Sequence, residues 1–337
     1  MKKHAEKAMT QTQRAAAELR ELSGLTKEAI EGLLSPNTRR AYLSTWRDFV
    51  AWCAALQLAP LPASSETIVA YVANLAREGL RASSIDRALA AIATVHKVAG
   101  HESPRRATIV QLARKAWRRK LGTAKRGKAP ILALQLRAMS DAAGTDLRGK
   151  RDRAIVLLAW HGAFRRSEVS ALNACDLRFE PEGLTVTLRR SKSDQESEGA
   201  RVGIPYGGHL ATCAVRAVQS WIEAASAYGL APEAPSPPLF VTLPGRGRVR
   251  KLGGERLDGK DIGRIVQRLA LRAGLDIPRG DVGAHSLRAG LVTQAARAGK
   301  PIQSILKQTR HRTLAVLLDY IRDADLYRDN AAAGLGT

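Results

Sequence analysis

Apolar residues in the first third of the chain recur at the spacing of helix faces. One face is predicted from the i, i+4, i+7 pattern of Tyr42, Trp46, Phe49, Val50, Cys53 and Leu56. A second helix is expected at 66–78, and a third starts at a cap formed by Ser83 or Ser84. A fourth is expected at 105–120, with its inward face formed by Ile109, Leu112, Ala116 and Trp117. No strand pattern interrupts them, so residues 35–120 are predicted to form a compact all-helical domain.

The pattern changes from residue 131 onward. Residues 153–163 form the most apolar helical stretch and are expected at the centre of a second core. Residues 184–188 alternate between apolar and polar, which predicts a strand that pairs with 201–206 as a β-hairpin. A further short strand is expected at 239–243, and another helix face is formed by Leu210, Ala214, Val218, Trp221 and Ile222. Residues 131–325 are thus predicted to form a mainly helical domain with a small antiparallel sheet.

Three remaining segments lack a clear apolar period. Residues 1–34 are polar and helix-prone, and they are interpreted as an N-terminal tail that either orders on a partner or stays mobile. Residues 121–130 are interpreted as a basic linker, because the stretch 114–128 holds eight lysines and arginines. We expect that stretch to contact phosphates, although a solvated charged face is the alternative. Residues 326–337 form a C-terminal tail.

Charge narrows the class of partner. The net charge is +23, and a protein this basic usually meets a polyanion, with nucleic acid as the first candidate. Residues 1–130 hold 23 basic and 10 acidic residues and the rest hold 31 and 21, so both predicted domains are basic. The three cysteines lie far apart, and no pair has the spacing of a zinc site or a disulfide framework. They are therefore expected to be buried thiols in a reducing compartment. The chain shows neither a membrane-span pattern nor a secretory signal pattern, so a cytoplasmic location is expected.

Groups suited to phosphate chemistry gather late in the chain. His285 and Arg288 stand three residues apart, and His311 precedes Tyr320. A guanidinium group binds phosphate through a fixed fork of donors, and an imidazole can move protons. Tyrosine is a possible oxygen nucleophile once a base takes its proton, because a free phenol has a pKa of about 10. The alternative for Tyr320, which stands between Leu318 and Ile321, is a core tyrosine.

Four segments together resemble one family. The stretch GAFRRSEVSAL at 162–172 resembles the first arginine box of the tyrosine recombinase (phage integrase) family, and HSLR at 285–288 resembles the second. RHRTLAVLLDYI at 310–321 resembles the third, and Lys192, just after a strand, is similar to the family's hairpin lysine. One departure is Arg310, where many members have glycine. The resemblance implies a two-domain C-shaped clamp: a helical, SAM-like core-binding domain at 35–120 and an α+β catalytic domain at 131–325.

The resemblance also implies a role for each residue. Tyr320 would attack a DNA phosphodiester and become joined to the 3′ phosphate, with His285 as its base. Arg165 and Arg288 would clamp the non-bridging oxygens, and His311 would donate to them. Lys192 would protonate the leaving 5′ oxygen. No metal and no nucleotide cofactor would be needed. Apart from the resemblance, Arg166 is expected to be a surface or support residue, and Glu168 to pair with a nearby cation or to support an arginine.

The implied partner is double-stranded DNA with a specific recombination site. Candidate DNA-contact residues are Arg39, Arg40, Arg81, Arg118, Arg119, Lys125 and Arg126. A homotetramer on two duplexes is expected, tied together by the C-terminal segment, unless that segment is only a frayed end. Two other functions stay open: an enzyme like the type IB topoisomerases, which relaxes DNA without exchanging partners, and a DNA-binding regulator that has lost catalysis.

Overall fold

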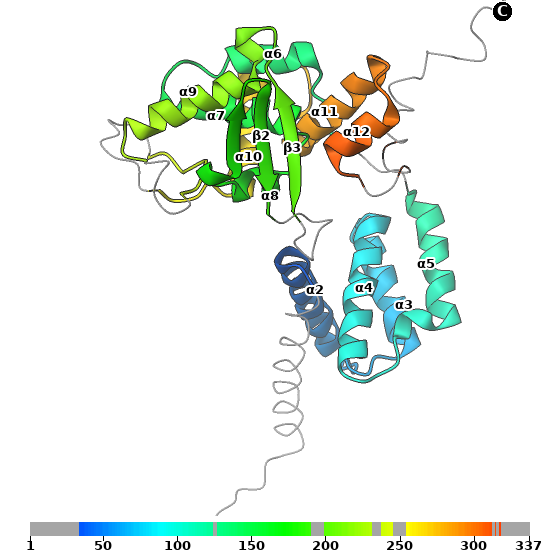
Figure 1. Cartoon of the computed structure of the whole chain (residues 1–337). Helices are drawn as coiled ribbons and strands as arrows, with labels where there is room; N and C mark the ends of the chain where they lie inside the picture. The colour runs from blue at the N-terminus through cyan, green and yellow to red at the C-terminus, as the bar shows by residue number, and fades with distance from the viewer. Residues whose placement is uncertain are drawn as a thin grey trace, which may run out of the picture. The chain divides into compact units, whose positions relative to one another are not determined.

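The computed structural model describes residues 34–123, 127–189, 199–230, 237–244 and 254–311, together with 314 and 317. The chain divides into two compact units, residues 1–125 and 126–337. Figure 1 shows their helices and strands. No helix among the described residues is both long enough and apolar enough to cross a membrane.

The described residues of the first unit form four α-helices. These are α2 (Pro36–Ala55), α3 (Ser65–Arg77), α4 (Ala82–Val98) and α5 (Thr108–Leu121), with a 3₁₀ turn, η1 (Pro104–Arg106), before the last. The hydroxyls of Ser35 and Ser64 cap α2 and α3 by accepting backbone N–H groups. The core gathers residues from all four helices, including Phe49, Ile68, Leu89 and Val110.

Two details of this unit differ from the sequence-based expectation. Of the four residues predicted to face inward on α5, Trp117 is half-buried and packs against the core, whereas Ile109 and Leu112 are 48% and 61% exposed and Ala116 is exposed. Val110, which was not predicted to face inward, is buried. Because of the 3₁₀ turn, α5 starts at Thr108, later than predicted. The inner face of α5 includes Arg114, which binds Asp86. Helix α4 begins at Ala82 without a side-chain cap, so neither Ser83 nor Ser84 caps it.

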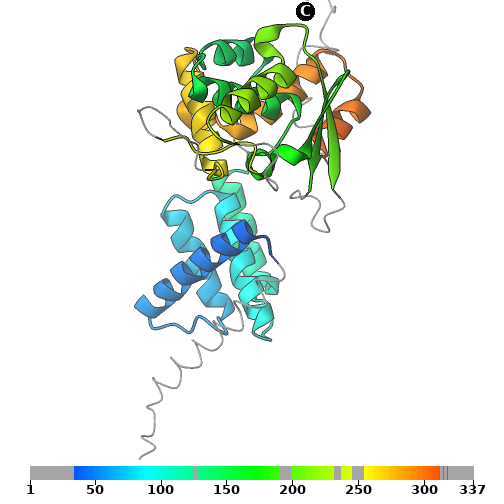
Figure 2. The same cartoon turned by 60° about the vertical axis from the view of Figure 1, so that its left-hand side comes forward.

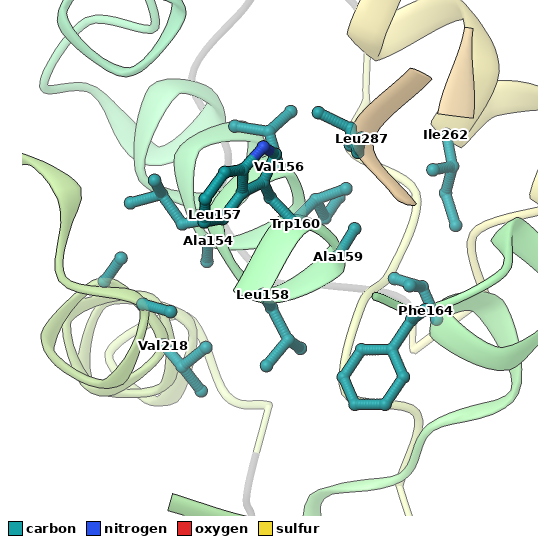
Figure 3. Packing of buried hydrophobic residues seen from close by; sticks show 14 of the residues in the cluster. Ala154, Val156, Leu157, Leu158, Ala159, Trp160, Phe164, Val218, Ile262 and Leu287 are labelled. Carbon is teal, nitrogen blue, oxygen red and sulfur yellow. The ribbon is translucent and has the colours of Figure 1, made fainter. Parts of the chain in front are cut away.

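The second unit is organised around α7 (Leu147–His161). Residues 154–160 of this helix are buried on every side, and in Figure 3 the side chains of Leu157, Leu158 and Trp160 lie among Val218, Ile262 and Leu287. Those partners come from three other helices: α9 (Ala214–Ser226), α10 (Gly259–Arg272) and α11 (Ala284–Arg297). Continuous burial explains why this stretch is apolar all round. The other α-helices of its described residues are α6 (Ala133–Asp141), α8 (Arg166–Ala171) and α12 (Ile302–Thr309), and the 3₁₀ turns there are η2 (Ala174–Asp176), η3 (Leu210–Thr212) and η4 (Arg279–Asp281).

An antiparallel three-stranded sheet completes this unit. Its order is β1 (Leu177–Glu180), β2 (Gly183–Leu188) and β3 (Ala200–Pro205). The predicted pairing of 184–188 with 201–206 is confirmed, since Val186 pairs with Val202. Strand β1 is additional to that prediction. In Figures 1 and 2, α12 lies beside the β3 edge, where the Gln308 side chain donates to the Gly203 carbonyl at 3.2 Å.

Two other predictions for this unit are wrong. Residues 239–243 do not form a strand, because Val241 makes only an isolated bridge to Arg256, with no ladder on either side. Leu239 and Val241 are apolar because they are buried. Leu210 lies in a 3₁₀ turn and is 74% exposed, so it is not part of the α9 face, which starts at Ala214. The predicted fold class, mainly helical with a small antiparallel sheet, is confirmed.

Candidate active site

A tight turn between α7 and α8 forms the base of the candidate site. Ala163 has a φ of 47°, which lies in the left-handed region, and it is fully buried. A Cβ added to Gly162 would lie 2.1 Å from the ring of Phe164, so the turn requires glycine there. This geometry exposes the Ala163 carbonyl oxygen to two guanidinium groups, those of Arg288 and Arg310.

Arg165 stands directly after that turn, as the N-cap residue of α8. Its Nη1 donates to Oε1 of Glu168 at 2.6 Å, and its backbone N–H donates to Oε2 at 2.8 Å. The Arg165 side chain is 23% exposed, whereas that of Glu168 is 1% exposed. The predicted support role of Glu168 thus has a structural basis, because its buried carboxylate binds both the side chain and the backbone of Arg165. Arg166, one residue on, is exposed.

Helix α11 contributes the second arginine and the first histidine. Arg288 is buried, and its Nη1 donates to the Ala163 carbonyl at 2.6 Å while its Nη2 donates to the Thr309 carbonyl. His285 is exposed in the first turn of the same helix. Arg288 therefore joins three segments: α11, the turn after α7 and the end of α12.

The second histidine follows α12. Arg310 ends that helix in a left-handed conformation, with φ 55° and ψ 40°, and turns the chain so that His311 comes back toward the other groups. Nδ1 of His311 lies 2.9 Å from the hydroxyl of Thr309, which is fully buried. Arg310, which departs from the glycine of the resembling family, thus adopts the conformation that glycine adopts most easily.

The Arg310 side chain also reaches into this region. Its Nη1 donates to the carbonyls of Gly162 at 3.1 Å and Gln308 at 2.9 Å, and its Nη2 donates to Oε2 of Glu168 at 2.9 Å. The guanidinium group lies over the Phe164 ring, 5.1 Å from its centroid. Arg310 thereby fastens the end of α12 to the turn that carries Arg165.

The two histidines share one electrostatic environment. Desolvation lowers the pKa of His311 to about 4, together with the charges of Arg288, Arg165, His285 and Arg310. Desolvation and the charges of Arg288 and Arg165 lower the pKa of His285 as well. Groups that influence one another in this way lie close together. At neutral pH the site therefore holds several fixed cations and two uncharged imidazoles, an arrangement suited to an anion.

Four of the six predicted catalytic residues thus come together: Arg165, His285, Arg288 and His311. Lys192 and Tyr320 lie outside the described residues. Two residues of the site were not foreseen as contributors, Thr309 and the Arg310 side chain. The departure from glycine at 310 was the available signal for the second. Nothing in the sequence pointed to Thr309.

The described candidate DNA-contact residues belong to the first unit, whereas Lys125 and Arg126 lie outside the described residues. Arg40, Arg81 and Arg119 are exposed, and Arg39 is half-buried on α2. Arg118 pairs with Asp86, which also binds Arg114. Burial alone would raise the pKa of Asp86, but hydrogen bonds and charge from these two arginines outweigh it and lower that pKa. Arg118 is therefore partly engaged within its own unit.

Comparisons with known proteins find similarity over most of the chain. The model of the phage integrase family matches residues 131–326, and that of the phage integrase N-terminal SAM-like domain matches 29–103. An integrase/recombinase xerD homolog of Selenomonas ruminantium is 35% identical over 314 residues, covering 92% of this chain and 88% of that protein. A tyrosine recombinase of Synechocystis sp. is 27% identical over 321 residues, covering 89% and 91%. The fold resembles that of the Tn1549 transposon integrase, solved in complex with transposon right end DNA. The TM-score is 0.61 at 17% identity, covering 89% of this chain and 94% of that one.

Proposed function

Because the chain belongs to the phage integrase family of tyrosine site-specific recombinases, we propose that it exchanges DNA strands through a covalent 3′-phosphotyrosine intermediate. The observation that carries the proposal is the way hydrogen bonds bring the arginines and histidines of the candidate site to one place. Arg288 donates to the Ala163 carbonyl, two residues before Arg165, and to the Thr309 carbonyl, and the Thr309 hydroxyl contacts His311. The lowered pKa values of His285 and His311 agree with this placement. Two guanidinium groups and two imidazoles can stabilise the charge that builds on a phosphodiester during attack.

The proposed reaction begins with Tyr320. Its phenolic oxygen attacks the phosphorus, the bond from phosphorus to the 5′ oxygen breaks, and the 3′ phosphate becomes an ester of the tyrosine. The phenolic proton passes to His285, whose lowered pKa leaves the ring neutral and able to accept it. Lys192 gives a proton to the departing 5′ oxygen. Arg165, Arg288 and His311 hold the non-bridging oxygens throughout.

Rejoining reverses these steps with a different 5′ hydroxyl. That hydroxyl attacks the phosphotyrosine, the phosphodiester reforms and Tyr320 regains its proton. The tyrosine ester conserves the bond energy, so the proposal requires no ATP. The arginines supply positive charge at the phosphate, so it requires no metal ion either. Exchange between two sites would integrate, excise or resolve a DNA segment.

The proposed substrate is double-stranded DNA with a specific recombination site, bound by a homotetramer on two duplexes. The net charge of +23 favours a polyanion. The Tn1549 integrase, which shares the fold, was solved with DNA. We assign DNA contact to Arg39, Arg40, Arg81, Arg118, Arg119, Lys125 and Arg126, and domain roles to 35–120 for DNA grip and 131–325 for catalysis. Residues 121–130 then link the two, and residues 1–34 and 326–337 are tails.

A covalent trapping experiment tests this function. A library of nicked duplexes is incubated with the protein, and DNA that stays bound in detergent is sequenced to find the site. We expect a covalent adduct with the wild-type chain and with Tyr327→Phe, the matched control, but none with Tyr320→Phe. An adduct that persists in Tyr320→Phe would overturn the nucleophile. Relaxation of supercoiled plasmids that lack paired sites would instead indicate an enzyme like the topoisomerases.

A further inference from the structure

The Glu168 carboxylate is shared between two arginines from distant parts of the chain. Oε1 accepts from Nη1 of Arg165 at 2.6 Å, and Oε2 accepts from Nη2 of Arg310 at 2.9 Å. The Glu168 side chain is 1% exposed. A carboxylate this buried requires a cation or several donors, because an unpaired charge in the interior is strongly unfavourable. Which of the two arginines supplies that cation decides how tightly Arg165 is held.

Arg310 is placed to supply it permanently. Its side chain is 11% exposed, and it is held by three backbone carbonyls as well as by Glu168. Arg165, in contrast, is 23% exposed and has Glu168 as its ion-pair partner among the described residues. A left-handed backbone conformation is unfavourable for most residues other than glycine. An arginine in that conformation at 310 indicates that the contacts of its side chain compensate for the backbone strain.

We propose that Arg310 is a positioning residue that keeps Glu168 compensated and so leaves Arg165 able to turn toward a substrate phosphate. This inference rests on the proposed function, in which Arg165 binds the phosphodiester. With Arg310 present, Arg165 can give up its bond to Glu168 without leaving a buried carboxylate unpaired. Without Arg310, Arg165 is the one arginine left to neutralise Glu168. A phosphate must then compete with Glu168 for the Arg165 guanidinium group.

The proposal predicts a specific pattern among variants of the full-length chain. The probe is inorganic phosphate at constant ionic strength, followed through the ring signals of His311 in NMR spectra. We expect Arg310→Gly to weaken phosphate binding about tenfold, the scale of one hydrogen bond between charged groups. Combining it with Glu168→Gln should restore the affinity to within about threefold of wild type, because a neutral amide needs no second cation. Arg272→Gly, which removes a charge from the exposed end of α10, is the matched control and should change little.

A second readout separates positioning from a general loss of charge. The Nε–H signal of Arg165, assigned by its disappearance in Arg165→Lys, should shift when phosphate is added to the wild type and to the double variant. In Arg310→Gly it should stay in place, because the guanidinium group remains on Glu168. Arg310→Lys keeps the positive charge but has a simpler donor group, so its affinity for phosphate should lie within about threefold of wild type. This variant replaces Arg310→Gly in the test if Arg310→Gly folds poorly.

Different results overturn the role of Arg310 and the proposed function. Unchanged affinity in Arg310→Gly, or a loss that Glu168→Gln does not relieve, overturns the role of Arg310. If Arg310→Gly does not fold, a tenfold loss in Arg310→Lys overturns it as well. Failure of the wild type to form a covalent DNA adduct overturns the proposed function instead, and the phosphate series does not depend on that reaction.

Discussion

The Thr309 hydroxyl holds the Nδ1 side of His311 at 2.9 Å. The same hydroxyl lies 2.7 Å from the Ile305 carbonyl, to which it donates its only proton. The hydroxyl oxygen therefore accepts the proton of Nδ1, and Nε2 of the neutral ring is left with its lone pair. His311 becomes a donor at Nε2 only when the ring is protonated, which an approaching phosphate would favour.

Removal of that hydroxyl should misplace His311. Thr309→Val keeps the shape of the buried side chain but leaves Nδ1 without its acceptor, which is expected to slow formation of the covalent adduct about tenfold. The free energy of unfolding should change by about 1 kcal/mol. Adduct rates on the trapped duplex and urea unfolding measure the two effects. Thr309→Ser, which retains the hydroxyl, is the control, and equal adduct rates in the valine and serine variants would contradict this role.

The pKa of His311 should respond to the anion. In the free protein it is about 4, held down by desolvation and by the surrounding cations. Saturation with inorganic phosphate brings negative charge to those cations and should raise it toward the ordinary value. An NMR titration of the ring with and without phosphate measures the change. A pKa that phosphate leaves unmoved would separate His311 from the anion site.

The same shift makes stability depend on pH. The folded pKa of His311 lies below the unfolded value of 6.5, so the unfolded chain binds more protons between those two values. The free energy of unfolding should therefore fall as the pH drops from 6.5 to 4, and this contribution is constant above 6.5. His311→Asn should reduce the fall between pH 7 and pH 5, measured by urea unfolding. His285 contributes in the same direction, so part of the fall should persist.

Close helix packing near Arg288 should make Gly290 sensitive to substitution. A Cβ at Gly290 would lie 1.9 Å from the Ile131 carbonyl oxygen and 2.9 Å from Nε1 of Trp160, two groups that hydrogen-bond to each other. We expect Gly290→Ala to lower the free energy of unfolding by about 1–3 kcal/mol. Gly263→Ala, at an open position in α10, should instead raise it by about 0.5–1 kcal/mol. Urea midpoints compare the pair, and equal shifts would contradict the packing argument.

Two adjacent arginines of α5 should behave differently toward DNA. Arg119 is exposed, so Arg119→Ala should weaken binding to any duplex and reduce the slope of log affinity against log salt by about 1. Arg118 pairs with Asp86, so Arg118→Ala should change the slope less and should destabilise the first unit. Fluorescence anisotropy with a labelled duplex at several salt concentrations measures the slopes. Identical slopes in the two variants would show that the Asp86 pair does not restrain Arg118.

Local patterns in the sequence were sufficient for much of the fold. Helix α7 and the β2–β3 pairing follow from burial and from alternation, because each pattern depends on neighbours in the chain. The predicted inward face of α5 was right only at Trp117: Val110 is buried in place of Ile109 and Leu112, and Arg114 is turned toward Asp86, a contact that apolar periodicity cannot reveal. The apolar residues 239–241 are buried without a strand partner, which sequence alone does not distinguish from a strand.

The candidate site divides in the same way. The sequence spacing indicated Arg165, His285, Arg288 and His311, because the resemblance fixes their order along the chain. It did not indicate that the carbonyl of Ala163 would orient two arginines, since that depends on a left-handed turn. It also could not show that Arg310 and Arg165 would meet on one carboxylate, a contact that spans 142 residues for Arg310.

The turn after α7 also sets when this site can first exist during protein synthesis. The contact between Ala163 and Arg288 joins residues 125 apart, and that between Gly162 and Arg310 joins residues 148 apart. A ribosome must therefore deliver almost the whole chain before the arginines and histidines can meet. The basic first unit emerges long before that point. A growing chain can thus be attracted to a polyanion before the groups of the candidate site have come together.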